Sequence, residues 1–123
     1  MGGRVMLQPQ EVEVFYVLPA IRRALAKAMI VQGLSQREVA KRLGLTEGAV
    51  SQYMHGKRAK SFPLGAGIRN AVRDSAARIT DPLTSVRETQ HLLKVAMQDK
   101  TTCKMHELLG AVPKNCSICF HHG

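Results

Sequence analysis

The chain has 123 residues, few aromatic side chains and no tryptophan, and it carries a formal net charge of +9. This length excludes several large domains and suits one compact domain with a small appendage. Up to residue 60, ten Lys and Arg stand against four Asp and Glu, whereas the remainder has eight against five. A positive excess concentrated in one half of a chain favours a nucleic acid as the partner.

The sequence predicts a cytoplasmic protein with no membrane partner. No apolar run approaches the roughly twenty residues that a membrane-spanning helix needs. The N-terminus lacks the apolar region and cleavage site of a secretory signal. In a cytoplasmic chain, the three cysteines are expected to be metal ligands or reduced thiols rather than a disulfide framework.

The first predicted element is a short strand at residues 11–17, where polar and apolar residues alternate at first (EVEVFYV). Two interpretations of this strand remain open. It is either an extended arm lying on the core or an arm that pairs with its copy in a two-fold dimer.

A helix is predicted to begin at Pro19, because proline suits the first helical position. Gly33 is expected to end it. Apolar residues recur through this segment at helical spacing: Leu18, Ile21, Leu25, Ala28 and Met29.

Residues 33–60 (GLSQREVAKRLGLTEGAVSQYMHGKRAK) predict two short helices joined by a tight turn. Ser35 and Glu38 form a capping-box pattern at the start of the first helix. Gly44 ends that helix, Thr46 caps the second, and Gly56 ends the second. Two helices joined by about four residues that include glycine are typical of a helix-turn-helix.

The outward side of the second helix indicates DNA binding. If its aliphatic residues face inward, Glu47, Ser51, Gln52 and His55 face outward, and Gly48 allows a close approach to the DNA backbone. A glutamine can form two hydrogen bonds with adenine, and a serine can serve several bases. The alternative is an ordinary helical hairpin with a solvated polar side.

Several other residues are predicted to contact phosphates. Gln36, at the start of the first helix, could bind a phosphate through its side-chain amide and the N–H groups of the helix N-terminus. The basic run after the second helix would grip the DNA backbone through Lys57, Arg58 and Lys60. The full predicted DNA-contact set is Gln36, Thr46, Glu47, Ser51, Gln52, His55, Lys57, Arg58 and Lys60.

This stretch resembles the helix-turn-helix of the Xre/Cro-repressor family. The framework positions of that family are matched by Ala40, Gly44, Leu45, Val50 and Tyr53. The resemblance implies that the helix from Thr46 to His55 enters the major groove of double-stranded DNA.

Two further helices are predicted after a breaker-rich link at residues 61–67. One runs from about Ala66 to Ile79. The other runs from about Pro82 to Gln98. The residues Thr80-Asp81-Pro82 are expected to end the first of these helices and to cap the second. These helices are expected to finish the bundle and could supply a dimer interface, and His91 is expected to be a surface or core residue rather than a ligand.

The C-terminal tail contains a second motif, in which Cys103 and His106 precede Cys116 and Cys119 (CxxH, nine residues, CxxC). Residues three apart on a helix share a face. Three thiolates and one imidazole form a tetrahedral set that structural zinc uses. The same residues could hold an iron–sulfur cluster, and the sequence favours neither metal over the other. The remaining alternative is that the thiols bind no metal.

The chain as a whole resembles a group of small prokaryotic, mainly archaeal, Xre-like regulators with a Cys-containing C-terminal tail. The likeness rests on residues 12–58 and the terminal CxxC. It implies a tail suited to a cluster, although this chain has three cysteines and His106 where four cysteines would be expected.

These patterns together predict an all-α, repressor-like bundle of five or six helices with an N-terminal extended arm and a Cys/His tail. Residues 1–62 would form the arm and DNA-binding unit, 63–100 a helical extension, and 101–123 the metal-binding tail. The predicted function is sequence-specific transcriptional regulation by a non-enzymatic homodimer, with a metal or redox response through the C-terminal tail left open. The alternative is a protein-interaction adaptor with a structural metal site.

Overall fold

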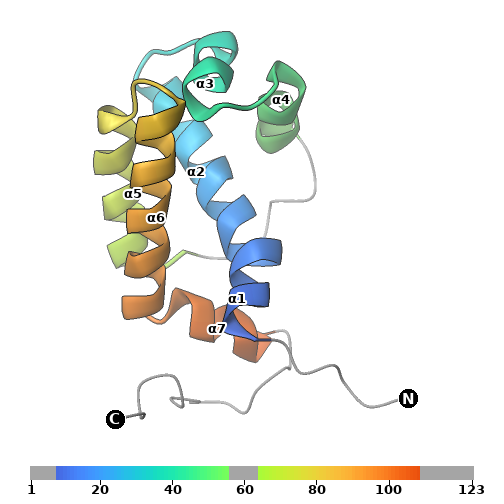
Figure 1. Cartoon of the computed structure of the whole chain (residues 1–123), viewed down its shortest axis with the longest axis vertical. Helices are drawn as coiled ribbons and strands as arrows, with labels where there is room; N and C mark the ends of the chain where they lie inside the picture. Colours follow the sequence, from blue (N-terminus) through green and yellow to red (C-terminus); the bar gives the residue numbers. More distant parts are fainter. Residues whose placement is uncertain (1–7, 56–63, 109–123) are drawn as a thin grey trace.

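The computed structural model describes residues 8–55 and 64–108 of the chain; for Thr102, Met105, His106 and Leu108 it describes the main chain alone. All regular elements in these two ranges are helices, which confirms the predicted all-α class (Figure 1). Their bounds are α1 Pro9–Val12, the π-helical η1 Glu13–Val17, α2 Leu18–Val31, α3 Gln36–Leu43, α4 Glu47–His55, α5 Ala66–Arg78, α6 Pro82–Gln98 and α7 Thr101–Leu108.

The predicted N-terminal strand and extended arm are wrong. Residues 9–31 instead form one continuous helical rod, made of α1, η1 and α2 (Figure 1). Val12 and Val17 are both fully buried, whereas Val14 and Phe15 are 57% and 64% exposed. A strand with one buried face would place Val12 and Val14 on the same side. The wider π-turn instead brings residues five positions apart onto one face, so the apparent alternation was a helical pattern.

The core gathers around the α2 part of this rod. α2 packs against α3, α4, α5 and α6, so it is the central helix of the bundle (Figure 1). Its buried residues lie at helical spacing, at Ile21, Leu25 and Met29, as predicted. Buried residues of the other helices complete the cluster: Val39, Ala40, Val50, Ile68, Val72, Ala76, Leu92 and Ala96, with Ile79 after α5.

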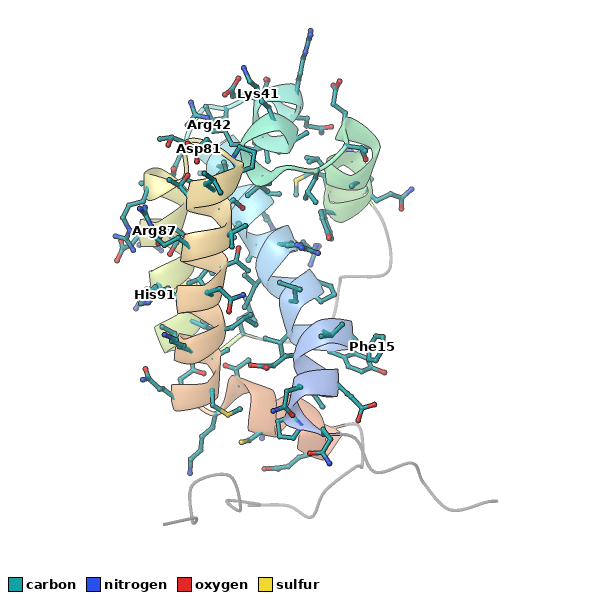
Figure 2. The ribbon with its side chains drawn as sticks, viewed as in Figure 1. Phe15, Lys41, Arg42, Asp81, Arg87 and His91 are labelled. Atoms are coloured by element: carbon teal, nitrogen blue, oxygen red, sulfur yellow. The ribbon has the colours of Figure 1, made fainter. Side chains whose placement is uncertain are left out.

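α5 and α6 match the two predicted C-terminal helices within one residue. Asp81 is the N-cap of α6, where its carboxylate accepts a 2.8 Å hydrogen bond from the Thr84 N–H. Thr84 Oγ1 in return accepts a 3.0 Å bond from the Asp81 N–H. The hydrogen bond from the Thr84 N–H, followed by one from the Thr84 side chain, holds the pKa of the Asp81 carboxylate below its ordinary value. His91 is exposed on α6 (Figure 2).

Asp99 joins the start of α5 to the start of α7. Its Oδ2 accepts a hydrogen bond from the Ile68 N–H at 3.1 Å. Its Oδ1 accepts bonds from the Thr101 N–H at 3.0 Å and the Thr101 hydroxyl at 2.6 Å. A Cβ on Gly65 would lie 3.0 Å from Asp99 Oδ2, so the absence of a side chain at residue 65 makes room for this contact. In the described ranges, no helix is both long and apolar enough to cross a membrane.

Candidate nucleic-acid interface

α3 begins after the Ser35 N-cap, as the sequence predicts, but only the serine half of the predicted capping box forms. The Ser35 hydroxyl accepts a 3.1 Å hydrogen bond from the Glu38 N–H. The Glu38 carboxylate accepts a 2.9 Å hydrogen bond from Arg42 Nε, one turn further along α3, rather than from the Ser35 N–H. This hydrogen bond is the main reason that the pKa of Glu38 lies below its ordinary value. Arg42 also donates to the main-chain oxygen of Ile79 at 3.4 Å, which ties α3 to the end of α5.

The turn between α3 and α4 has the predicted geometry. Gly44 has φ of +69°, in the left-handed region that glycine adopts without a side-chain penalty. The Leu45 N–H then donates to the Ala40 oxygen at 2.9 Å, which closes the end of α3. Thr46 caps α4 by accepting a 3.0 Å bond from the Ala49 N–H. α4 therefore leaves the turn at a fixed angle to α3.

One side of α4 is anchored to the bundle. Val50 is fully buried, and Leu45, Tyr53 and Met54 are half-buried. α4 packs against α2 and α3. At its C-terminal end, Arg23 Nε donates to the main-chain oxygen of Tyr53 at 3.1 Å. These contacts fix which face of α4 points away from the protein.

That outer face carries the side chains predicted to contact bases. Glu47, Gln52 and His55 are exposed, together with Gly48, and Ser51 is half-exposed. The Thr46 residue is exposed, but its hydroxyl oxygen also serves as the α4 cap. α4 lies at the edge of the bundle (Figure 1), and the side chains predicted to contact bases are at least half-exposed on it.

The predicted phosphate contacts are only partly within the described residues. Gln36 is half-buried in the first turn of α3. Lys57, Arg58, Lys60 and the predicted helix end at Gly56 lie outside the described ranges. Two exposed cations that the sequence analysis did not select, Arg37 and Lys41, lie one helical turn apart on α3 (Figure 2 labels Lys41). The sequence could have identified them, because two basic residues four positions apart share one face of a helix, here away from the buried side of α3.

The predicted metal ligands are described only in part. Cys103 and His106 both belong to α7, three positions apart, and Cys103 is half-buried. Cys116 and Cys119 lie outside the described ranges, and so does the side chain of His106. Among the residues with described side chains, no three His, Cys, Asp or Glu are grouped in a way that could hold a metal ion.

Comparison with known proteins agrees with this geometry. Residues 25–64 match the family model described as helix-turn-helix, so the chain contains such a domain, a unit through which regulators contact DNA. The match covers the second half of α2 through α4 and supports the Xre/Cro-type resemblance. No curated protein matches the chain. No solved structure matches it either.

Proposed function

We propose that this chain is a sequence-specific transcriptional regulator that reads the major groove of double-stranded DNA with α4. The observation that carries the proposal is the orientation of α4. Val50 anchors the helix in the core, while Gln52 stands exposed on the opposite side. A helix-turn-helix places the exposed face of its second helix against base edges. The match of residues 25–64 to a helix-turn-helix family supports the same reading.

Gln52 and Ser51 are the proposed base-reading residues, with Glu47 as a weaker one. Gln52 has the amide that can pair with adenine through two hydrogen bonds, an interaction worth about 1–3 kcal/mol of discrimination. Gln36, Thr46, His55, Lys57, Arg58 and Lys60 remain the other proposed contacts. The exposed Arg37 and Lys41 add two candidates for phosphate binding.

The test is a selection of preferred duplexes from a random pool, followed by titration of the best duplex and a scrambled one. Gln52→Ala should reduce the difference in affinity between them by about 1–3 kcal/mol. Gln90→Ala is the matched control, because Gln90 is an exposed glutamine on α6. A Gln52→Ala variant that keeps the wild-type preference would contradict the groove assignment.

The salt dependence tests the phosphate contacts separately. Lys57→Ala should weaken binding to every duplex alike and reduce the slope of log K against log salt by about 1. Lys94→Ala, an exposed lysine on α6, is the control. If the protein functions as a protein-interaction adaptor instead, its DNA affinity should be weak, with little salt dependence and no preference among duplexes.

We propose a homodimer as the DNA-binding form. One reading helix covers few base pairs, and two half-sites about one helical turn apart multiply the specificity. On α6, Leu83 and Val86 are 81% and 60% exposed, and apolar exposure of this kind supports an interface. Sedimentation velocity of wild type and a Leu83→Lys/Val86→Lys variant tests this, and a monomeric wild type bound to DNA would contradict it.

We also propose a metal site formed by Cys103, His106, Cys116 and Cys119. The half-buried position of Cys103 and its placement in α7 with His106 suit a pair of ligands from one helix. The donor set fits either structural zinc or an iron–sulfur cluster. A cluster would make DNA binding redox-responsive, whereas zinc would be structural.

Metal analysis and a visible absorption spectrum after anaerobic purification distinguish these cases. Equimolar zinc supports a structural ion, and iron with sulfide supports a cluster. Cys116→Ser/Cys119→Ser should lose either one. Purified protein with neither zinc nor iron would contradict the metal proposal and leave the DNA-binding proposal intact.

A further inference from the structure

An open groove of about 420 Å³ lies between α2 and α5, in addition to the helix-turn-helix face. The two helices pack against each other. Small-molecule pockets usually have volumes of about 300–1,000 Å³ and mostly apolar walls with a few polar groups. The residues that line this groove are Ala24, Lys27, Ala28, Val31, Gln32, Arg69, Val72 and Arg73.

The floor of the groove is apolar because its residues are small or aliphatic. Ala24 and Ala28 lie one helical turn apart on α2, and both are half-buried. Val31, at the next turn, is 80% exposed, which is unusual for a valine beside a hydrophobic core. At one end, Gln32 Nε2 donates a 3.3 Å hydrogen bond to the Arg73 main-chain oxygen and joins the two walls. The groove therefore leaves an apolar surface in contact with solvent.

Three cationic side chains surround this apolar floor. Lys27 comes from the α2 wall, and Arg69 and Arg73 lie one turn apart on the α5 wall. All nine Asp and Glu residues of the chain lie in the described ranges. Within those ranges, no salt bridge joins any of the three cations to a carboxylate. The rim thus has a positive charge that the protein's own acidic side chains do not neutralise.

We propose that this groove binds an amphipathic anion, a small molecule with an aliphatic body and one carboxylate. The aliphatic body would cover Ala24, Ala28 and Val31, and the carboxylate would accept hydrogen bonds from the arginine side chains. Arginine guanidinium groups are well matched to carboxylates in geometry and charge. A DNA phosphate would use the positive rim alone and would leave the apolar floor uncovered. The proposal is independent of the function proposed for α4.

Calorimetric titration of the full chain with octanoate tests the proposal, with octyltrimethylammonium as a ligand of similar length and opposite charge. Octanoate should bind with one site per chain, and octyltrimethylammonium should show no saturable binding. Arg69→Gln/Arg73→Gln should weaken octanoate binding at least tenfold. Ala28→Leu should also weaken it at least tenfold, because the larger side chain would occupy the floor. Lys94→Gln/Lys104→Gln removes the same charge away from the groove and should bind as wild type does.

Circular dichroism and thermal unfolding of each variant establish that the fold is kept. Three results would overturn the proposal: no saturable octanoate binding by wild type, equal binding by Ala28→Leu, or an equal loss in Lys94→Gln/Lys104→Gln. The last result would assign the effect to net charge alone. If Ala28→Leu does not fold, Ala24→Val at the next turn of the same floor replaces it with the same expected loss.

Discussion

Arg23 Nε donates a 3.1 Å hydrogen bond to the main-chain oxygen of Tyr53, and so connects the central helix α2 to α4. Tyr53 lies in the last turn of α4, which ends at His55. Carbonyls in the last turn of a helix lack an intrahelical partner, and a cation there also interacts favourably with the helix dipole. Arg23 therefore secures α4 at the end opposite to its Thr46 cap.

Replacing Arg23 tests this attachment. Arg23→Met keeps an aliphatic stem but removes the donor and the charge, so the free energy of unfolding should fall by about 1–2 kcal/mol. DNA affinity should fall as well, because α4 would be less firmly positioned. Urea denaturation and DNA titration measure the two effects. Arg22→Met, at the neighbouring position of α2, should cost less stability; an equal cost in both variants would contradict the role given to Arg23.

Two glycines of the helix-turn-helix should respond oppositely to alanine. Gly44→Ala should lower the free energy of unfolding by about 1–2 kcal/mol, because φ of +69° is unfavourable for a residue with Cβ. Space is not the cause, since the nearest atom to an added Cβ is Pro82 Cβ at 3.5 Å. Gly48→Ala should instead stabilise α4 by up to about 1 kcal/mol, since alanine is the better helix former. Thermal unfolding of both variants measures these changes in stability. Destabilisation by Gly48→Ala would contradict the prediction made for Gly48.

The Asp99 contact should matter for the junction of α5 and α7. Asp99→Ala removes the acceptor for the Ile68 N–H and for Thr101, and should lower the free energy of unfolding by about 1–3 kcal/mol. Gly65→Ala should also destabilise, because its Cβ would lie 3.0 Å from Asp99 Oδ2. Asp74→Ala, an exposed residue on α5, is the control. Equal stability of Asp99→Ala and Asp74→Ala would show that this cap contributes little.

Glu88 should make stability depend on pH. Its carboxylate is buried, which raises the pKa, but hydrogen bonds from Ser75 at 2.7 Å and from Arg78 and Arg87 at 3.2 Å outweigh burial (Figure 2 labels Arg87). The folded-state pKa therefore lies below its ordinary value. The stabilisation is complete above the ordinary Glu pKa of about 4.3 and is lost as the pH falls through the lower folded-state value.

Glu88→Gln removes this titration. The variant should be less stable than wild type at pH 7 by about 1–3 kcal/mol, and the difference should shrink as the pH falls toward 3. Urea denaturation at several pH values measures it. Glu38→Gln, which removes a more exposed carboxylate bonded to Arg42, should show a smaller difference. A gap between wild type and Glu88→Gln that stays constant from pH 7 to 3 would contradict the assignment.

The sequence was sufficient for elements whose signals are local. Ser35, Gly44, Thr46 and Asp81 each act on main-chain groups within five residues, so their spacing alone located both ends of α3 and the starts of α4 and α6. The buried positions Ile21, Leu25 and Met29 of α2 followed from helical periodicity for the same reason. The outward position of Gln52 followed from the inward position of Val50.

Contacts between distant residues could not be predicted in this way. Arg23 and Tyr53 are 30 positions apart, and Asp99 and Ile68 are 31 apart. Neither pair has a spacing pattern, because their proximity results from how the helices pack. The cationic groove likewise depends on the packing of α5 against α2. The three-part domain division, the cytoplasmic location and the archaeal grouping stay predictions.

The π-helical turn at η1 indicates how the N-terminal rod could change in length during evolution. A π-turn is equivalent to one additional residue within an ordinary α-helix. Loss of one exposed residue, Val14 or Phe15, would leave Val12 four positions before Val17 and convert the turn to regular α-helix. Both valines would keep their buried positions. Relatives that are one residue shorter at this point should therefore retain the same core, whereas a deletion within α2 would shift every buried side chain before it.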